Sequence, residues 1–150
     1  MSAAAQTPRI IVVGVDGSEP SRRALRWAAQ QAKLTSAALN VVTSWEFPPS
    51  FGWAPPYPQE FDPNQDARKA LEETVGAELG TDPEVVVQLT VVEGHPSLVL
   101  TEAARGAELL VVGSRGHGAF AGMLLGSVSE YCASHSPCPV VVVRHPDDEP

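Results

Sequence analysis

Five short apolar runs, each rich in β-branched residues, are spaced along the chain. Four of them are nearly continuous rather than alternating, which is typical of strands buried on both faces of a parallel sheet. We therefore expect five strands, with the central ones fully covered. The predicted strands span residues 10–15, 39–44, 85–92, 109–112 and 140–143.

Segments with helical periodicity separate these runs. Ser18 is a good N-cap residue, Pro20 follows it in the first turn, and an apolar stripe continues to about Leu34. The second helix is expected to end at Gly80, because glycine is the commonest residue just past a helix end. The predicted helices span residues 19–34, 63–79, 97–105 and 127–136.

Strands that alternate with helices predict an α/β fold: a single doubly wound five-stranded parallel sheet, order 3-2-1-4-5, with helices on both faces. We expect one domain over residues 8–145, with flexible tails at 1–7 and 146–150. The segment 45–63 is an exception, because its prolines and aromatic residues exclude a regular helix or central strand. It is either a ligand or partner contact or a flexible loop.

Composition narrows the class of protein. The 150 residues are 43% hydrophobic and carry a net charge of −8, a balance that disfavours nucleic-acid binding. The N-terminus lacks a signal-peptide pattern, and the first apolar run is far shorter than the roughly 20 residues of a membrane span. We therefore expect a cytoplasmic protein without membrane contact. Cys132 and Cys138 show no metal-binding or disulfide pattern and are interpreted as buried small residues.

The ends of the strands at 10–15 and 109–112 are expected to carry the chemistry. In an open parallel sheet a ligand sits beyond the carboxyl ends of the strands, where the winding reverses direction. With the order 3-2-1-4-5, that position lies between these two strands. Asp16 follows the first strand, and a glycine-rich segment that continues to Gly126 and Ser127 follows the second. The two loops should therefore converge on one crevice.

The second loop favours an anion. Glycines let main-chain amides approach a ligand, and a helix that opens at Ser127 presents N–H groups without internal partners. The hydroxyls of Ser127 and Ser129 and the amide of Val128 would add donors, while Arg115 supplies a charge or points to solvent. The alternative is that the glycines only make turns. Asp16 suits a ribose hydroxyl, or instead caps the helix that follows it.

These residues resemble the universal stress protein family. Its ATP-binding members carry Gly-x2-Gly-x9-Gly-Ser/Thr, which Gly113, Gly116, Gly126 and Ser127 match at every fixed position. The opening Val-Gly-Val-Asp-Gly-Ser, the run Gly-Ser-Val-Ser and the closing Cys-Pro-Val-Val-Val-Val-Arg also agree. The resemblance covers about residues 8–144. The long segment 45–63 departs from the family pattern.

The resemblance implies an ATP site. Asp16 and Gly113 would hold the ribose, Gly14 and Val15 would border the nucleotide, and the main chain from Val42 to Ser44 would meet the adenine edge. Gly126 and its neighbours would cradle the phosphates. The residues assigned to this part of the site are Ser114, Arg115, Gly116, His117, Gly118, Gly126, Ser127, Val128 and Ser129.

The family also implies a homodimer that pairs the last strand with its copy, here through Val140, Val141, Val142 and Val143. An apolar edge strand left open is an aggregation hazard, and pairing removes it. Members of this kind are linked to stress and dormancy responses, and the downstream partner is not predicted.

Candidate catalytic groups are few. His117 and Glu130 are interpreted as loop and surface residues, and Asp16 is a single carboxylate that could help hold magnesium. Glu93 and His95 are expected to lie too far around the sheet to contribute. We therefore expect a regulatory module that binds ATP, with AMP and cyclic AMP as alternative ligands, and no dedicated enzyme activity. The alternatives are a nucleotide-independent dimeric interaction protein and a weak ATPase or nucleotidyl-transfer enzyme.

Overall fold

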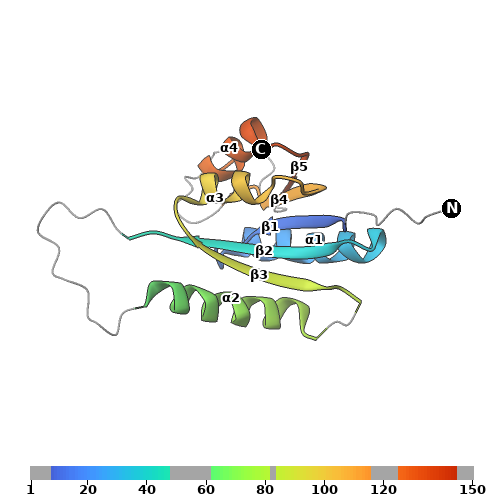
Figure 1. Cartoon of the computed structure of the whole chain (residues 1–150), viewed down its shortest axis with the longest axis horizontal. Coiled ribbons are helices and arrows are strands. Elements are labelled where there is room, and N and C mark those ends of the chain that lie inside the picture. Colours follow the sequence, from blue (N-terminus) through green and yellow to red (C-terminus); the bar gives the residue numbers. More distant parts are fainter. Residues whose placement is uncertain (1–7, 48–61, 82–83, 116–124, 145–150) are drawn as a thin grey trace, which may run out of the picture.

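The computed structural model describes residues 8–47, 62–81, 84–115 and 125–144. Strands and helices alternate through these ranges (Figure 1). The strands are β1 (Ile10–Gly14), β2 (Ala38–Trp45), β3 (Val87–Glu93), β4 (Leu109–Gly113) and β5 (Val140–Val143). The helices are α1 (Glu19–Thr35), α2 (Pro63–Leu79), α3 (Pro96–Ala103) and α4 (Ser127–His135). The predicted tails and the interior of the proline-rich segment lie outside the described residues.

All five strands are parallel, in the order β3-β2-β1-β4-β5, which confirms the predicted topology. Helices α1 and α2 cover one face of the sheet, and α3 and α4 cover the other (Figure 1). The register pairs Gly14 at the end of β1 with Val42, so β2 runs on past β1 as far as Trp45. This overhang forms one side of the site described below.

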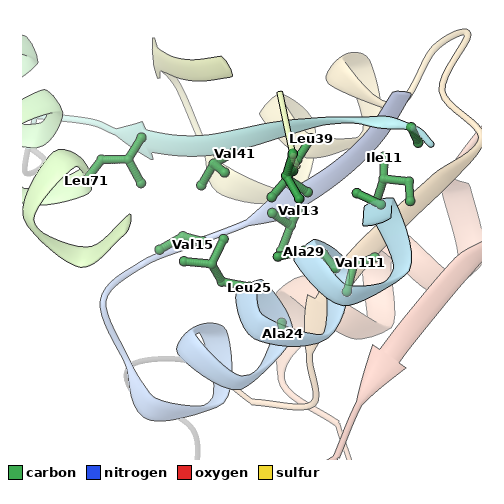
Figure 2. Packing of buried hydrophobic residues seen from close by; sticks show 14 residues of the cluster. Ile11, Val13, Val15, Ala24, Leu25, Ala29, Leu39, Val41, Leu71 and Val111 are labelled. Carbon is green, nitrogen blue, oxygen red and sulfur yellow. The ribbon is translucent and has the colours of Figure 1, made fainter. Parts of the chain in front are cut away.

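Alternation of side chains along the central strands divides the core into two layers. On one face Val13 and its neighbours pack against Leu25 and Ala29 of α1, with Leu71 of α2 at the margin (Figure 2). On the other face Val12 packs with side chains of α3 and α4. The three central strands are therefore covered on both sides, as their continuous apolar runs predict.

The two edge strands differ from that expectation. The predicted strand at 85–92 begins at Val87 in the structure, and Val87 and Val92 remain 36% and 38% exposed. All four residues of β5 are half-buried. An edge strand has a neighbouring strand on one side only. At the edge of a sheet, an apolar run therefore predicts a strand but does not predict that its residues are fully buried.

Local signals account for the helix boundaries. The Ser18 side chain accepts a hydrogen bond from the N–H of Ser21 at the start of α1 (3.4 Å). Asp62 does the same for Gln65 at the start of α2 (3.1 Å), and Gly80 ends that helix with a φ of 61°. Within the described residues, none of the helices is long and apolar enough to cross a membrane.

Candidate functional site

An open pocket of about 400 Å³ lies at the carboxyl edge of the sheet, within the size range of small-molecule sites. It is lined by residues that follow β1, β2, β3 and β4 and by the start of α4. The two loops that sequence reasoning places together do meet in this pocket. The predicted residues among its lining are Gly14, Val15, Asp16, Val42, Ser44, Gly113, Arg115, Gly126, Ser127, Val128 and Ser129.

Two lining glycines lie close to helices that pack beside the pocket. A Cβ atom on Gly14 would lie 2.6 Å from Cδ1 of Leu100, a side chain of α3. A Cβ atom on Gly113 would lie 2.7 Å from the carbonyl oxygen of Pro20 in α1. The atom near Gly14 is the end of a flexible side chain, which can move, whereas the atom near Gly113 belongs to helix backbone. Gly113 is therefore the glycine that lets α1 approach the sheet beside the pocket.

Asp16 lies in a turn held by hydrogen bonds between β1 and α1. Its main-chain N–H donates to Oγ of Ser21 (3.2 Å). Its Oδ1 atom accepts from both the N–H (3.0 Å) and the hydroxyl of Ser18. The capping position of α1 belongs to Ser18, so the alternative role of Asp16 as the helix cap does not hold. The Asp16 residue is exposed and lines the pocket.

The main chain at the end of β2 provides the second polar feature. Alternate residues of a parallel strand direct both their N–H and C=O to the same neighbour. The Val42 carbonyl accepts from the N–H of Val15 (2.9 Å), which places Val42 and Ser44 on the β1 side. Because β1 ends opposite Val42, no described strand residue lies opposite Ser44 on that side. Of the predicted range, Ser44 is thus the residue that offers main-chain groups to the pocket.

The start of α4 provides a third polar feature. Gly126 is the N-cap residue, and no side chain caps this helix end. The first bond of the helix runs from the N–H of Glu130 to the carbonyl of Gly126 (3.0 Å). The N–H groups of Ser127 and Val128 precede that bond, so the helix itself supplies no carbonyl for them. Both residues line the pocket.

Ser114 and Ser129 support this helix start from behind. The N–H of Gly126 donates to the Ser114 carbonyl (2.7 Å), and the Ser129 hydroxyl donates to the same oxygen (2.9 Å) and to the Gly126 carbonyl (3.0 Å). The hydroxyl of Ser129 has one proton, and these acceptors use it. Ser114 is fully buried and is not part of the pocket lining. Contrary to expectation, the Ser129 hydroxyl therefore positions the loop instead of presenting a donor to the pocket, and the Ser114 carbonyl holds the same loop.

Only part of the predicted glycine-rich loop lies within the described residues. Gly116, His117 and Gly118 lie outside the described residues, while Arg115 is half-buried and lines the pocket. Among the residues that the structure describes, no cluster of three or more metal-ligating side chains occurs. The suggested role of Asp16 toward magnesium therefore remains a prediction.

Sequence reasoning missed the contribution of the β3–α3 loop. The N–H of Gly94 donates to the carbonyl of Trp45 (2.8 Å), which brings this loop beside the end of β2. Glu93 and His95, which were expected to lie too far around the sheet, are not among the lining residues, but their neighbours Gly94 and Pro96 are. A signal was present, because the predicted order already placed the third strand beside the second. The lining residues missed in this way and elsewhere are Ser21, Trp45, Glu46, Gly94, Pro96, Leu100 and Val112.

Trp45 and Glu46 connect the proline-rich segment to the pocket. Both line it, and they open the segment whose interior lies outside the described residues. The indole N–H of Trp45 donates to Oδ1 of Asn64 in the first turn of α2 (2.9 Å). The aromatic start of this segment is therefore fixed to the helix that follows it.

The fold and the pocket together define an open, doubly wound α/β protein with a ligand-sized site at the point where the winding reverses. The profile of the universal stress protein family matches residues 8–144. The chain belongs to the universal stress protein family.

Individual relatives agree with this assignment. A universal stress protein of Mycobacterium tuberculosis is 36% identical over 144 residues, which cover 92% of this chain and 44% of the relative. The chain spans about half the length of the curated relatives it matches. A crystal structure of a universal stress protein in complex with cAMP is 36% identical, with a TM-score of 0.61, and the match covers 90% of this chain and 95% of that one. A universal stress protein from Lactobacillus plantarum shares the fold, with 21% identity, a TM-score of 0.72, and coverage of 91% and 97%.

Proposed function

We propose that this chain is a cytoplasmic nucleotide-binding module of the stress response, with ATP as its ligand and without a dedicated catalytic reaction. The observation that carries the proposal is the set of three polar features along one pocket. Ser44 with its main-chain groups, Asp16 with its carboxylate, and the first residues of α4 with their amides all belong to its lining. They suit, respectively, the base, the sugar and the phosphates of a nucleotide.

At the base end, the N–H and C=O of Ser44 form an adjacent donor and acceptor. Adenine presents the complementary pair on its Watson–Crick edge, an amino group that donates and a ring nitrogen that accepts. Guanine presents a carbonyl oxygen and a ring N–H in the same places, so both contacts would be reversed. The main chain at Ser44 therefore favours adenine.

At the phosphate end, α4 directs uncapped amides and the positive end of its dipole toward the pocket. Ser127 is exposed and adds a hydroxyl, and Arg115 lines the same pocket. The relative solved with cAMP is 36% identical over nearly its whole length. That complex supports an adenine nucleotide as the ligand class, and the full glycine pattern favours ATP within that class.

The proposal is tested by isothermal titration of the purified protein with ATP, AMP, cyclic AMP and GTP, with and without magnesium. We expect ATP to bind and GTP to bind much more weakly. If none of the nucleotides binds, the function proposed here is wrong and a nucleotide-independent interaction protein replaces it. Steady release of phosphate from ATP would instead support the ATPase alternative.

A matched pair of variants tests the base contact. Ser44→Pro removes the N–H that faces the pocket, whereas Ser44→Ala removes only the hydroxyl. Thr43, the residue before the new proline, is already in a strand, the conformation that proline requires there. We expect Ser44→Pro to weaken ATP binding by about 10-fold or more, because the loss of one partner leaves a polar group unpaired. Equal affinities for the two variants would place the base elsewhere.

A further inference from the structure

We propose that Ser18 is a positioning residue for the ribose, because its hydroxyl fixes the carboxylate of Asp16 in the orientation that the sugar requires. The inference rests on the proposed function, since it concerns the same nucleotide pocket. It gives Ser18 a role beyond the helix cap that its residue type predicts.

Two donors from Ser18 reach the same carboxylate oxygen. The N–H of Ser18 lies 3.0 Å from Oδ1 of Asp16, and the Ser18 hydroxyl donates to that oxygen as well. Two donors on one oxygen restrain rotation of the carboxylate group. The direction of the other oxygen, Oδ2, is thereby set as well. Since Asp16 lines the pocket, this restraint acts on a side chain at the proposed ribose end of the site.

The same hydroxyl also belongs to the start of α1. Its oxygen accepts from the N–H of Ser21 at 3.4 Å, a long contact, while its only proton goes to Asp16. The Ser21 hydroxyl completes the turn, because it donates to the Ser18 carbonyl (2.9 Å) and accepts from the N–H of Asp16 (3.2 Å). Ser21 is buried and lines the pocket. The carboxylate is thus held by a closed set of hydrogen bonds anchored on a helix.

Capping alone does not explain this arrangement. Aspartate, asparagine and glycine also serve at a helix N-cap. Aspartate at position 18 would have no proton for Asp16 and would place a second negative charge beside it. Serine and threonine can accept from the helix amide and donate to the carboxylate with one atom. The choice of a hydroxyl at position 18 therefore follows from the site as well as from the helix.

The experiment compares Ser18→Gly with Ser18→Thr. Glycine removes the hydroxyl yet remains a good N-cap residue, and threonine retains the hydroxyl. Each variant is titrated with ATP and with dideoxy-ATP, which lacks both ribose hydroxyls, and its thermal melting is recorded. We expect Ser18→Gly to weaken ATP binding by about five-fold, the effect of one hydrogen bond, and to leave dideoxy-ATP binding unchanged. Ser18→Thr should bind both ligands like the parent.

A double-mutant cycle completes the test. If Ser18 acts through Asp16, then Ser18→Gly should have no further effect on ATP affinity in an Asp16→Ala background. Additive effects of the two changes, or an equal loss of ATP and dideoxy-ATP affinity in Ser18→Gly, would overturn the role of Ser18 while the nucleotide site stands. A parent protein that binds neither ligand would overturn the proposed function and this inference together.

Discussion

At the scale of single residues, the sequence predicts which positions line the pocket better than it predicts what each side chain does there. Val42, Ser114 and Ser129 are at or beside the site, but the Val42 carbonyl accepts from Val15, the Ser114 carbonyl accepts from Gly126, and the Ser129 hydroxyl donates to main-chain carbonyls. A motif gives the position of a hydroxyl along the chain. It does not give the direction of the hydroxyl's proton, which depends on carbonyls brought near by the fold.

Cys132 shows how burial alone sets the chemistry of a residue. Its side chain is fully buried in α4, and burial raises the pKa of its thiol to about 11. The interpretation of Cys132 as a small core residue is confirmed. A thiol that resists ionisation is a poor nucleophile near neutral pH.

The raised pKa of Cys132 predicts a pH dependence of stability. The unfolded chain releases the thiol proton at a lower pH than the folded chain, so stability should fall as the pH rises above about 9. The slope attributable to this group is at most about 1.4 kcal/mol per pH unit. Urea unfolding of the parent and of Cys132→Ala between pH 8 and 10.5 would measure it. Parallel curves for the two proteins would contradict the prediction.

At the scale of elements, the helices were the most predictable parts. The expected helix at 63–79 coincides with α2, because proline and glycine mark its ends. Of the two edge strands, β5 was predicted with its observed bounds, whereas β3 begins at Val87 and not at residue 85. The proline-rich segment was predicted as a break in regular structure, and the described residues at its start reach the pocket through Trp45.

The contact between α1 and α2 is the basis of a second stability prediction. Hydrogen bonds from Arg26, and then from Arg22, hold the pKa of the Glu78 carboxyl below its usual value. This stabilisation is present above the unfolded pKa of about 4.3 and is lost as the pH falls through the folded value. We expect Glu78→Gln to cost about 0.5–1 kcal/mol at pH 7, a modest figure because Arg26 is 43% exposed to solvent.

Chemical unfolding at pH 7 and pH 3 would measure the effect of Glu78→Gln. The parent and the variant should differ at pH 7 and approach each other toward pH 3, as the pH falls through the lowered pKa of the Glu78 carboxyl. A difference that persists unchanged at pH 3 would mean that the glutamine perturbs packing, and that the ion pairs contribute little.

At the scale of the whole molecule, the order of the strands was predictable from the alternation of elements and the rules of parallel sheets. That order determined where the site would lie. The extent of the pocket was not predictable, because it depends on how far β2 extends past β1 and on the placement of the β3–α3 loop. Both depend on the register between neighbouring strands. A short apolar run predicts that register only to within about a residue or two.

Among the strands that the structure describes, β5 has a neighbour on one side only, and this edge predicts self-association. The carbonyl of Pro139 accepts from the N–H of Leu110, and the carbonyl of Val143 accepts from the N–H of Ser114. The main-chain groups of Pro139, Val141 and Val143 therefore face β4. The main-chain groups of Val140 and Val142 therefore face away from β4, toward the edge. We expect a homodimer formed by β5, as the family resemblance implies, and Val142→Pro should convert it to a monomer by removing an outward N–H.

Light scattering of the eluate from a sizing column would measure the mass of the Val142→Pro variant and of the parent. Val142→Thr, which retains the N–H and the shape of the side chain, is the matched control and should remain dimeric. A parent that elutes as a monomer, or a proline variant that remains dimeric, would place the association surface elsewhere.

The close approach of Pro20 to Gly113 bears on how the glycine motif evolves. Any side chain at position 113 would push α1 away from β4, whether or not a ligand is bound. A homologue that no longer binds a nucleotide would still need glycine at position 113. The residues at the start of α4 would no longer be under selection for nucleotide binding. Within this motif, we therefore expect substitutions to appear first at the start of α4 and last at Gly113.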